Sequence, residues 1–138
     1  MGLRQAGTKC ETMAENSLDI FVIAKGKAFM IIVRITMIAF MDKRREVMQT
    51  LLSMIEPTEN MVGCLSCNVS RDIEENNIFS MIQEWKNRKD LDDHIKSDRF
   101  SVLLGTKSLL YEPPQIEIHT VSHSEGMEIV NITRRKRR

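Results

Sequence analysis

The chain has 138 residues, of which 42% are hydrophobic and 28% are charged. This size and composition indicate one soluble globular domain with a single hydrophobic core. The longest apolar run, FMIIVRITMIAFM, is interrupted by Arg34 and is too short to cross a bilayer, so we expect no membrane partner.

The net charge of +1 hides an uneven distribution of charge along the chain. Residues 134–138, RRKRR, carry five positive charges, so residues 1–133 hold 15 basic against 19 acidic side chains, a net charge of −4. Nucleic-acid affinity comes from clustered Lys and Arg, so we do not expect this acidic body to bind nucleic acid. The basic tail is either a solvated end or a contact for RNA, DNA or an acidic surface.

The three cysteines, Cys10, Cys64 and Cys67, are few and odd in number, which is typical of a protein from a reducing cytoplasm. The segment CLSC, residues 64–67, matches the C-x-x-C spacing of redox dithiols and of half a zinc site. It lies in a strand-like run, where residues three apart point to opposite faces, and no second C-x-x-C completes a zinc site. We therefore expect neither a redox pair nor a metal site.

Three segments differ in character along the chain. Residues 1–29 are polar and carry acidic side chains where a signal peptide or a mitochondrial presequence would not. We expect them to be an N-terminal extension, disordered or outside the native protein, with Met30 as the natural start. Residues 30–122 then form the domain, and residues 123–138 form a C-terminal arm with the basic tail.

Hydrophobic periodicity predicts the elements of the domain in chain order. They are a strand at 30–40, a helix at 42–56 that Pro57 ends, a hairpin of strands at 63–72 and 77–85, a helix at 88–104 broken near Ser97, and a strand at 115–122. Residues 126–133 add a short strand or an arm across a dimer seam. The order β-α-β-β-α-β predicts a ferredoxin-like α+β fold, a four-stranded antiparallel sheet with helices on one face. Its other face needs a cover, and a second copy of the chain is the simplest one.

The first strand has one apolar face and one mixed face. Arg34 and Thr36 lie on the mixed face, and Asn68 of the second strand is placed there too. This pattern predicts a half-polar cavity on that side of the sheet. A buried Arg34 needs an acidic or carbonyl partner, for which Glu84 is the candidate, and it is either a structural ion pair or an anchor for an anionic ligand.

The chain resembles the antibiotic biosynthesis monooxygenase (ABM) domain family over roughly residues 30–120. The resemblance is carried by the first strand at Met30, by the hairpin GCLSCNVSRDIEENNIFSMIQEW, and by the W-x8-H-x5-F spacing of Trp85, His94 and Phe100. It implies a homodimer, a dimeric α+β barrel, with a cavity between sheet and helices in each protomer. Some members oxidise phenols or quinols with oxygen and without metal or flavin, so the resemblance implies that no cofactor is needed.

Other members of the family degrade haem, isomerise small metabolites or have no known activity, and the fold alone does not choose among these. The haem-degrading pattern has Asn, Trp and His where this chain has Thr36, His94 and Leu104. We therefore do not expect haem ligation in that manner.

His94 and Trp85 each have two interpretations. His94 borders the apolar stripe of its helix, where it is either a proton-transfer group or a structural residue near a dimer seam. Trp85 ends the third strand, where it either stacks on a flat ligand or packs in the core.

The favoured hypothesis is a cytoplasmic homodimer that acts as a cofactor-independent monooxygenase on a quinol-like or polyphenolic small molecule. In it His94 is catalytic, and Trp85, Arg34, Thr36 and Asn68 bind the substrate. The alternative is a non-catalytic ligand-binding or stress-response protein, or a small-metabolite isomerase, on the same scaffold.

Overall fold

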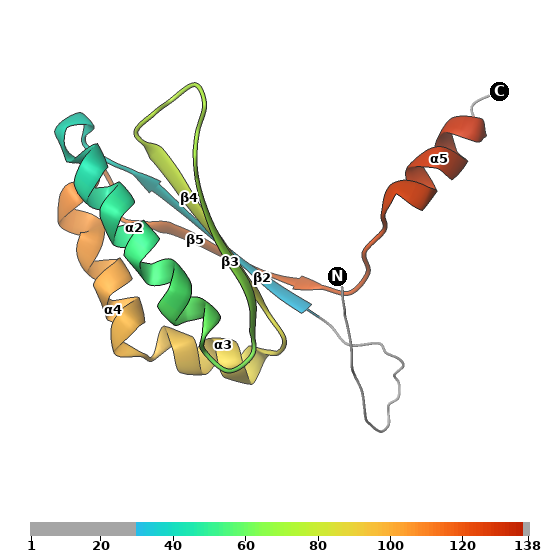
Figure 1. The fold of residues 1–138 in the computed structure, drawn as a ribbon, viewed down its shortest axis with the longest axis horizontal. Helices are drawn as coiled ribbons and strands as arrows, with labels where there is room; N and C mark the ends of the chain where they lie inside the picture. Colours follow the sequence, from blue (N-terminus) through green and yellow to red (C-terminus); the bar gives the residue numbers. More distant parts are fainter. Residues whose placement is uncertain (1–29, 137–138) are drawn as a thin grey trace. The chain divides into compact units, whose positions relative to one another are not determined.

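The computed structural model describes residues 30–136, and it confirms the predicted ferredoxin-like α+β fold (Figure 1). The expectations for residues 1–29 lie outside the described residues. Contacts divide the chain into two compact units, one of them residues 30–120. The described part of the other unit begins at Val121.

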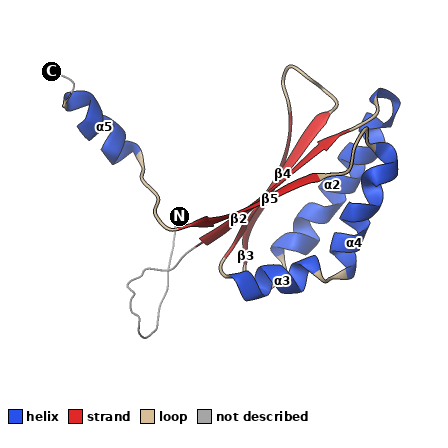
Figure 2. Ribbon diagram, turned by 180° about the vertical axis from the view of Figure 1, so that it is seen from behind, coloured by secondary structure: helices blue, strands red, loops and turns tan. Residues whose placement is uncertain are grey.

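Four strands form one antiparallel sheet in the order β3-β4-β2-β5, drawn red in Figure 2. They are β2 (Met30–Ile38), β3 (Cys64–Arg71), β4 (Ile78–Trp85) and β5 (Gln115–Val121). The apolar side chains of β2 alternate between buried and less buried, as the period of two requires. Ile31, Val33, Ile35 and Met37 face the core, and the intervening residues face the other side of the sheet.

The helices of this unit cover one face of the sheet (Figures 1 and 2). They are α2 (Arg44–Glu59), α3 (Arg88–Ile95) and α4 (Asp98–Leu104), with short 3-10 turns η1 (Met41–Lys43) and η2 (Gly105–Leu109). Each helix buries an apolar stripe against the sheet, as Val47, Leu51 and Met54 of α2 do. None of the described helices is both long enough and apolar enough to cross a membrane.

The prediction that Pro57 ends the first helix was wrong, because α2 continues through Pro57 to Glu59. A proline inside a helix removes one backbone donor and crowds the carbonyl four residues earlier. Here the proline lies in the last turn, where the loss is confined to one hydrogen bond. The next residue, Thr58, is fully buried, and its carbonyl accepts from the backbone N–H of Met61. Packing of Thr58 therefore carries the helix past the proline.

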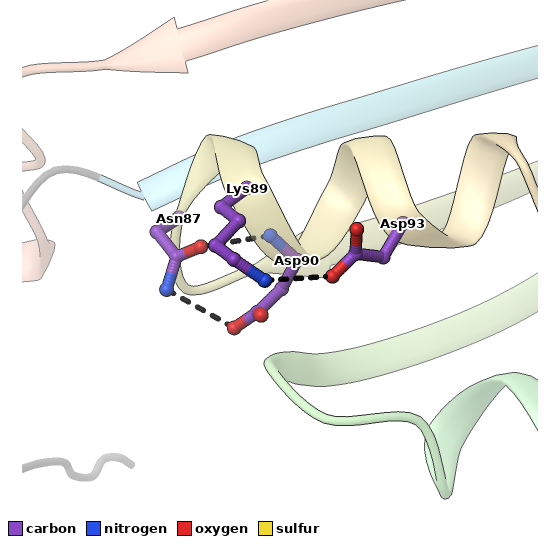
Figure 3. A network of polar contacts seen from close by, with 4 residues as sticks. All are labelled: Asn87, Lys89, Asp90 and Asp93. Atoms are coloured by element: carbon purple, nitrogen blue, oxygen red, sulfur yellow. Dashed lines mark hydrogen bonds and ion pairs between the residues drawn. The ribbon is translucent and has the colours of Figure 1, made fainter.

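The two helices that follow β4 each begin at a side-chain cap. The side chain of Asn87 accepts a hydrogen bond from the backbone N–H of Asp90 at 2.9 Å, and its amide donates to the Asp90 carboxylate at 3.1 Å (Figure 3). In the same way Ser97 accepts from the backbone N–H of Phe100 at 3.3 Å. These bonds satisfy donors at the helix starts and fix where α3 and α4 begin.

A β-bulge at the start of β3 corrects the expected orientation of the two cysteines. Cys64 lies opposite Trp85, while Ser66 lies opposite Glu84, so one extra residue interrupts the register. Cys67 then lies opposite Gln83. Because Trp85 and Gln83 face the helices, Cys64 and Cys67 share that face, and the prediction of opposite faces was wrong. The simple alternation rule fails across a bulge.

The turn that leads into β3 depends on Gly63, whose φ of +85° is in the left-handed region. Its carbonyl accepts a hydrogen bond from the backbone N–H of Lys86 at 2.8 Å, which ties the turn to the end of β4. A Cβ built on Gly63 would overlap the carboxyl group of Asp90 in α3. Glycine is therefore required here both by backbone conformation and by space.

In the other unit, residues 127–135 form the helix α5 (Met127–Arg135), so the strand alternative for this segment was wrong, while the arm across a dimer seam stays a prediction. The segment MEIVNITRR has apolar residues at helical spacing, which strand-favouring isoleucines and valine obscure in so short a stretch. Gly126 precedes the helix in an extended conformation, and Lys136 ends it.

Candidate functional site

The structure brings Trp85, His94 and Phe100 together under the helices. The imidazole of His94 stacks on the Trp85 indole, with ring centroids 5.0 Å apart and ring planes inclined by 27°. Phe100 meets the same imidazole edge-on, with centroids 5.4 Å apart. All three side chains are buried. The W-x8-H-x5-F spacing thus corresponds to one aromatic cluster built from the end of β4, from α3 and from α4.

The two ring nitrogens of His94 have different surroundings. Its Nδ1 lies 3.0 Å from the sulfur of Met61, which follows α2. A thioether sulfur has no hydrogen to donate, so this contact is a hydrogen bond only when Nδ1 carries the proton. The neutral ring then presents its lone pair at Nε2. That atom is buried and has no hydrogen-bond partner among residues 30–136.

Burial lowers the pKa of His94 below its ordinary value, because removal from water disfavours the charged imidazolium. No acidic side chain contributes to the shift. The ring is therefore neutral at physiological pH. A buried, neutral imidazole with an unpaired nitrogen can accept a proton or a hydrogen bond from a hydroxyl group that reaches it.

A hollow of about 480 Å³ opens beside this cluster. Its lining residues come from the end of α2 and from the beginning of α4: Met61, Ser97, Asp98, Arg99 and Val102. Met61 is shared between the two features, because it lines the hollow and contacts His94. The hollow and the imidazole are thus separated by one flexible, unbranched side chain.

A short chain of polar contacts runs along β4 next to the aromatic cluster. The Trp85 indole N–H donates to the Gln83 side-chain oxygen at 2.9 Å, and the Gln83 amide donates to the Met81 sulfur at 3.3 Å. Gln83 is fully buried, as is Thr58 of α2, whose hydroxyl has no hydrogen-bond partner in the described part of the chain. The Trp85 indole is thereby held by its own strand and not left free for a ligand to bond.

Sequence reasoning missed the role of Met61, which stands 33 residues before His94. No local feature of the sequence predicts a contact between two residues so far apart in the chain. The buried contact of Gln83 was easier to predict from the sequence, because Gln83 lies on the strand face that also carries Trp85, Met81 and Phe79. A glutamine among apolar residues on a core-facing strand is a signal of a buried polar contact.

Arg34, Thr36 and Asn68 lie on the opposite face of the sheet. Arg34 of β2 and Asn68 of β3 flank Ile82 of β4 from its two sides, because each is its cross-strand partner. Thr36 lies opposite Ser80 in the next row. The helices cover the other face, so this face, which we call the open face, is not covered by any helix of residues 30–120 (Figure 2).

The five predicted site residues therefore form two groups and not one. Trp85 and His94 belong to the core beneath the helices, while the other three lie on the open face. The expected ion pair between Arg34 and Glu84 is absent from the described residues. Arg34 is exposed, and Glu84 accepts a hydrogen bond from the Ser66 hydroxyl at 3.0 Å. Where a cavity was expected on the mixed face, residues 30–120 present a sheet face without a helix over it.

The CLSC cysteines are thiols and not thiolates. Burial, followed by the nearby Cys67, raises the pKa of Cys64 to about 12. Burial and then Glu59 raise the pKa of Cys67 to about 11. Both shifts keep the thiols protonated and poorly nucleophilic at neutral pH. Within residues 30–136 no three His, Cys, Asp or Glu side chains are grouped so that they could hold a metal ion.

A four-stranded antiparallel sheet, helices on one face, and a buried aromatic cluster with one histidine define a ferredoxin-like α+β protomer. The model of the antibiotic biosynthesis monooxygenase family matches residues 30–103. This match covers more than half of the 138 residues, and the chain belongs to that family.

Individual proteins are similar to the chain in the same region. A conserved protein of Methanosarcina mazei Go1 is 30% identical, with a TM-score of 0.63, and the match covers 67% of this chain and 92% of that one. A candidate antibiotic biosynthesis monooxygenase of Deinococcus radiodurans is 20% identical, with a TM-score of 0.65, and the match covers 70% of this chain and 96% of that one. The second likeness shows the fold.

An uncharacterised protein of Synechocystis sp. is 29% identical over 87 residues. The match covers 62% of this chain and spans 59% of the length of that relative.

Proposed function

We propose that the chain is a monooxygenase that needs no cofactor and acts on a quinol-like or polyphenolic small molecule. The observation that carries this proposal is the buried neutral imidazole of His94, with Nδ1 at the Met61 sulfur and Nε2 without a partner among the described residues. Such a nitrogen can accept a hydrogen bond, and then the proton, from a phenolic hydroxyl. Membership of the family supports the reaction class.

In the proposed reaction, His94 Nε2 takes the proton of a phenolic hydroxyl. The resulting phenolate is electron-rich and transfers an electron to O2, and the two radicals combine to form a carbon–oxygen bond as a peroxide. The proton held by His94 passes to the outer oxygen of the peroxide. The oxygen–oxygen bond then breaks as the ring carbon loses its hydrogen as a proton, and the outer oxygen leaves with both protons as water, which gives a quinone and restores the neutral imidazole. The substrate loses two hydrogens and gains one oxygen atom, and the second oxygen leaves as water, so the substrate supplies all the electrons.

The protein would contribute a base and a dry site to this reaction. The Trp85 and Phe100 rings exclude water around the imidazole and hold its plane. A substrate seated in the hollow approaches the imidazole from the side of Met61, and therefore from Nδ1. To reach Nε2 it must displace the Met61 side chain, and the ring must turn about its Cβ–Cγ bond.

This proposal gives a different role to the three polar residues of the open face, Arg34, Thr36 and Asn68. We propose that a second copy of the chain covers the open face, which carries the half-buried Ile32, Ile38 and Ile82 among its polar residues. An apolar sheet face with no helix over it needs such a cover. The three polar residues then line the seam of a homodimer. The oxyanion role first expected of Arg34 requires a ligand at that seam.

Oxygen consumption by the full-length protein tests the function. The protein is treated with a chelator and given a panel of quinols and polyphenols, and O2 uptake and hydrogen peroxide release are measured. His94→Gln should lower turnover by about 100-fold or more, as loss of a general base does. His119→Gln, at an exposed histidine of β5, is the control and should leave turnover unchanged. Thermal melting of each variant checks that it is folded.

The alternative function, a non-catalytic binding protein, is favoured by one observation. Within the described residues His94 contacts a thioether and two aromatic rings, and no second titratable side chain assists it. Absence of O2 uptake across the panel, together with saturable binding of a polyphenol seen by Trp85 fluorescence, would select this alternative.

The homodimer is tested by light scattering on Ile82→Lys, which places a second positive charge beside Arg34 on the open face. A monomer is expected, because an unpaired charge at the centre of an interface is costly. Glu74→Gln in the turn between β3 and β4 is the control and should remain a dimer. A wild-type protein that is already monomeric would overturn this part of the proposal.

A further inference from the structure

The helix α5 has two chemically different sides. At 100° per residue, Ile129, Val130, Ile132 and Thr133 fall within an arc of about 160°. Asn131, Arg135 and Glu128 occupy the opposite arc. Such a division is typical of a helix that lies along a boundary between a polar and an apolar phase.

The apolar side is accessible to solvent. Val130 is 44% exposed and Ile132 is 37% exposed, while Ile129 is half-buried. No residue of α5 is buried. A helix of nine residues is too short to be stable by backbone hydrogen bonds alone, so an apolar side of this kind gains stability from a surface on which it rests.

Basic residues follow one another at the end of the helix. Arg134 and Arg135 occupy its last turn, Lys136 follows, and the sequence continues with Arg137 and Arg138. The long stems of Arg and Lys can extend along an apolar surface while their charged groups stay in water. The partner of this segment must therefore offer negative charge and hydrocarbon together.

We propose that α5 and the adjoining basic residues bind the surface of an anionic lipid bilayer, with the apolar side in the headgroup region and the basic groups at lipid phosphates. A nucleic acid offers phosphates but little for three aliphatic side chains to enter. A second copy of the chain also offers apolar surface, and its residues 1–133 carry a net charge of −4, so self-association is the competing outcome of the test. Surface attachment of this kind differs from a membrane span, and it revises the expectation that the protein has no membrane partner.

Sedimentation of the full-length protein with lipid vesicles tests the proposal. Vesicles that contain phosphatidylserine in phosphatidylcholine should bind the protein, and phosphatidylcholine vesicles should not. Arg134→Gln with Arg135→Gln should weaken binding roughly 25-fold, since each basic group near an anionic surface is worth roughly a fivefold change. Val130→Ser with Ile132→Ser should weaken binding by at least about tenfold, as the loss of buried aliphatic surface requires. Asn131→Ser, on the polar side of the same helix, is the matched control and should bind as wild type.

Three results would overturn the proposal. Vesicle binding that is unchanged by the paired serine substitutions would show that the apolar side takes no part. Binding of a polyuridine oligonucleotide, without vesicle binding, would identify nucleic acid as the partner. Self-association that the serine pair abolishes, again without vesicle binding, would identify a second copy. The function proposed above is independent of each outcome, because it concerns residues 30–120.

Discussion

The imidazole of His94 stacks on the Trp85 indole at a centroid distance of 5.0 Å, and its Nδ1 lies 3.0 Å from the Met61 sulfur. This relationship joins three segments that are far apart in sequence: the residues after α2, the end of β4, and α3. It also leaves one nitrogen of a buried neutral histidine without a partner among the described residues. The chemistry proposed for the protein depends on that nitrogen.

The first prediction concerns the pH dependence of stability. Burial lowers the folded pKa of His94 below the ordinary value of 6.5, so the unfolded chain binds the proton first as the pH falls. Stability contributed by the neutral ring is therefore complete above about pH 6.5 and is lost as the pH falls from there to the folded pKa. Urea unfolding between neutral and mildly acidic pH should show a loss in the wild type that His94→Gln lacks. Carboxylates common to both proteins cancel in the difference, and an equal loss in the two would contradict the assignment.

The second prediction concerns Gly63. Gly63→Ala should lower the free energy of unfolding by about 1–3 kcal/mol, because alanine is strained at positive φ and its methyl group meets Asp90. Gly105→Ala is the matched control. Gly105 has ordinary helical angles, with φ −68°, and nothing lies within 4 Å of an added Cβ. Gly105→Ala should therefore leave the free energy of unfolding unchanged or raise it by up to about 1 kcal/mol. Denaturant melts of both variants decide the matter, and equal effects would refute the strained turn.

The third prediction concerns the cap of α3. Asn87→Ala removes the acceptor for the Asp90 backbone N–H and should cost about 1 kcal/mol of stability. Lys89→Ala, which breaks the exposed ion pair of Lys89 with Asp93 in Figure 3, should have little effect because water screens that pair. Chemical denaturation measures both. A larger loss for Lys89→Ala than for Asn87→Ala would invert the expected order.

The fourth prediction concerns the reactivity of the cysteines. A pKa raised from 9.0 to about 11 leaves Cys67 with about 100-fold less thiolate at a given pH below that range. In a Cys10→Ser background, alkylation by iodoacetamide followed by mass spectrometry should be slow at Cys64 and Cys67 in the folded protein. In denaturant both should react at the rate of an ordinary thiol. Fast labelling of the native protein would show that the pair is activated.

Much of the fold could be predicted because its signals are local. The alternation in MIIVRITMI, the caps Asn87 and Ser97, and the turn before Ile78 each depend on residues that are close in sequence. The errors arose where packing overrode a local rule. Burial of Thr58 carries α2 past Pro57, and a bulge turns Cys64 to the face of Cys67.

The residues of the candidate site could be singled out from the sequence, but their arrangement in space could not be predicted from it. Trp85 and His94 were singled out by residue type, and the structure places them in contact. Their separation from Arg34, Thr36 and Asn68 follows from which face of β2 the helices cover, and no single strand pattern decides that when both faces carry apolar residues. The contact of Met61 with His94 depends on the packing of the whole unit.

Neighbouring residues of β4 face opposite sides of the sheet. Gln83 and Trp85 face the helices and the imidazole, while Ile82 and Glu84 face the open side of the sheet. A mutational scan along this one strand should therefore alternate in phenotype, with odd-numbered positions affecting the interior and even-numbered positions affecting association. Eight consecutive residues thus allow the two surfaces to be altered independently, although they share a backbone.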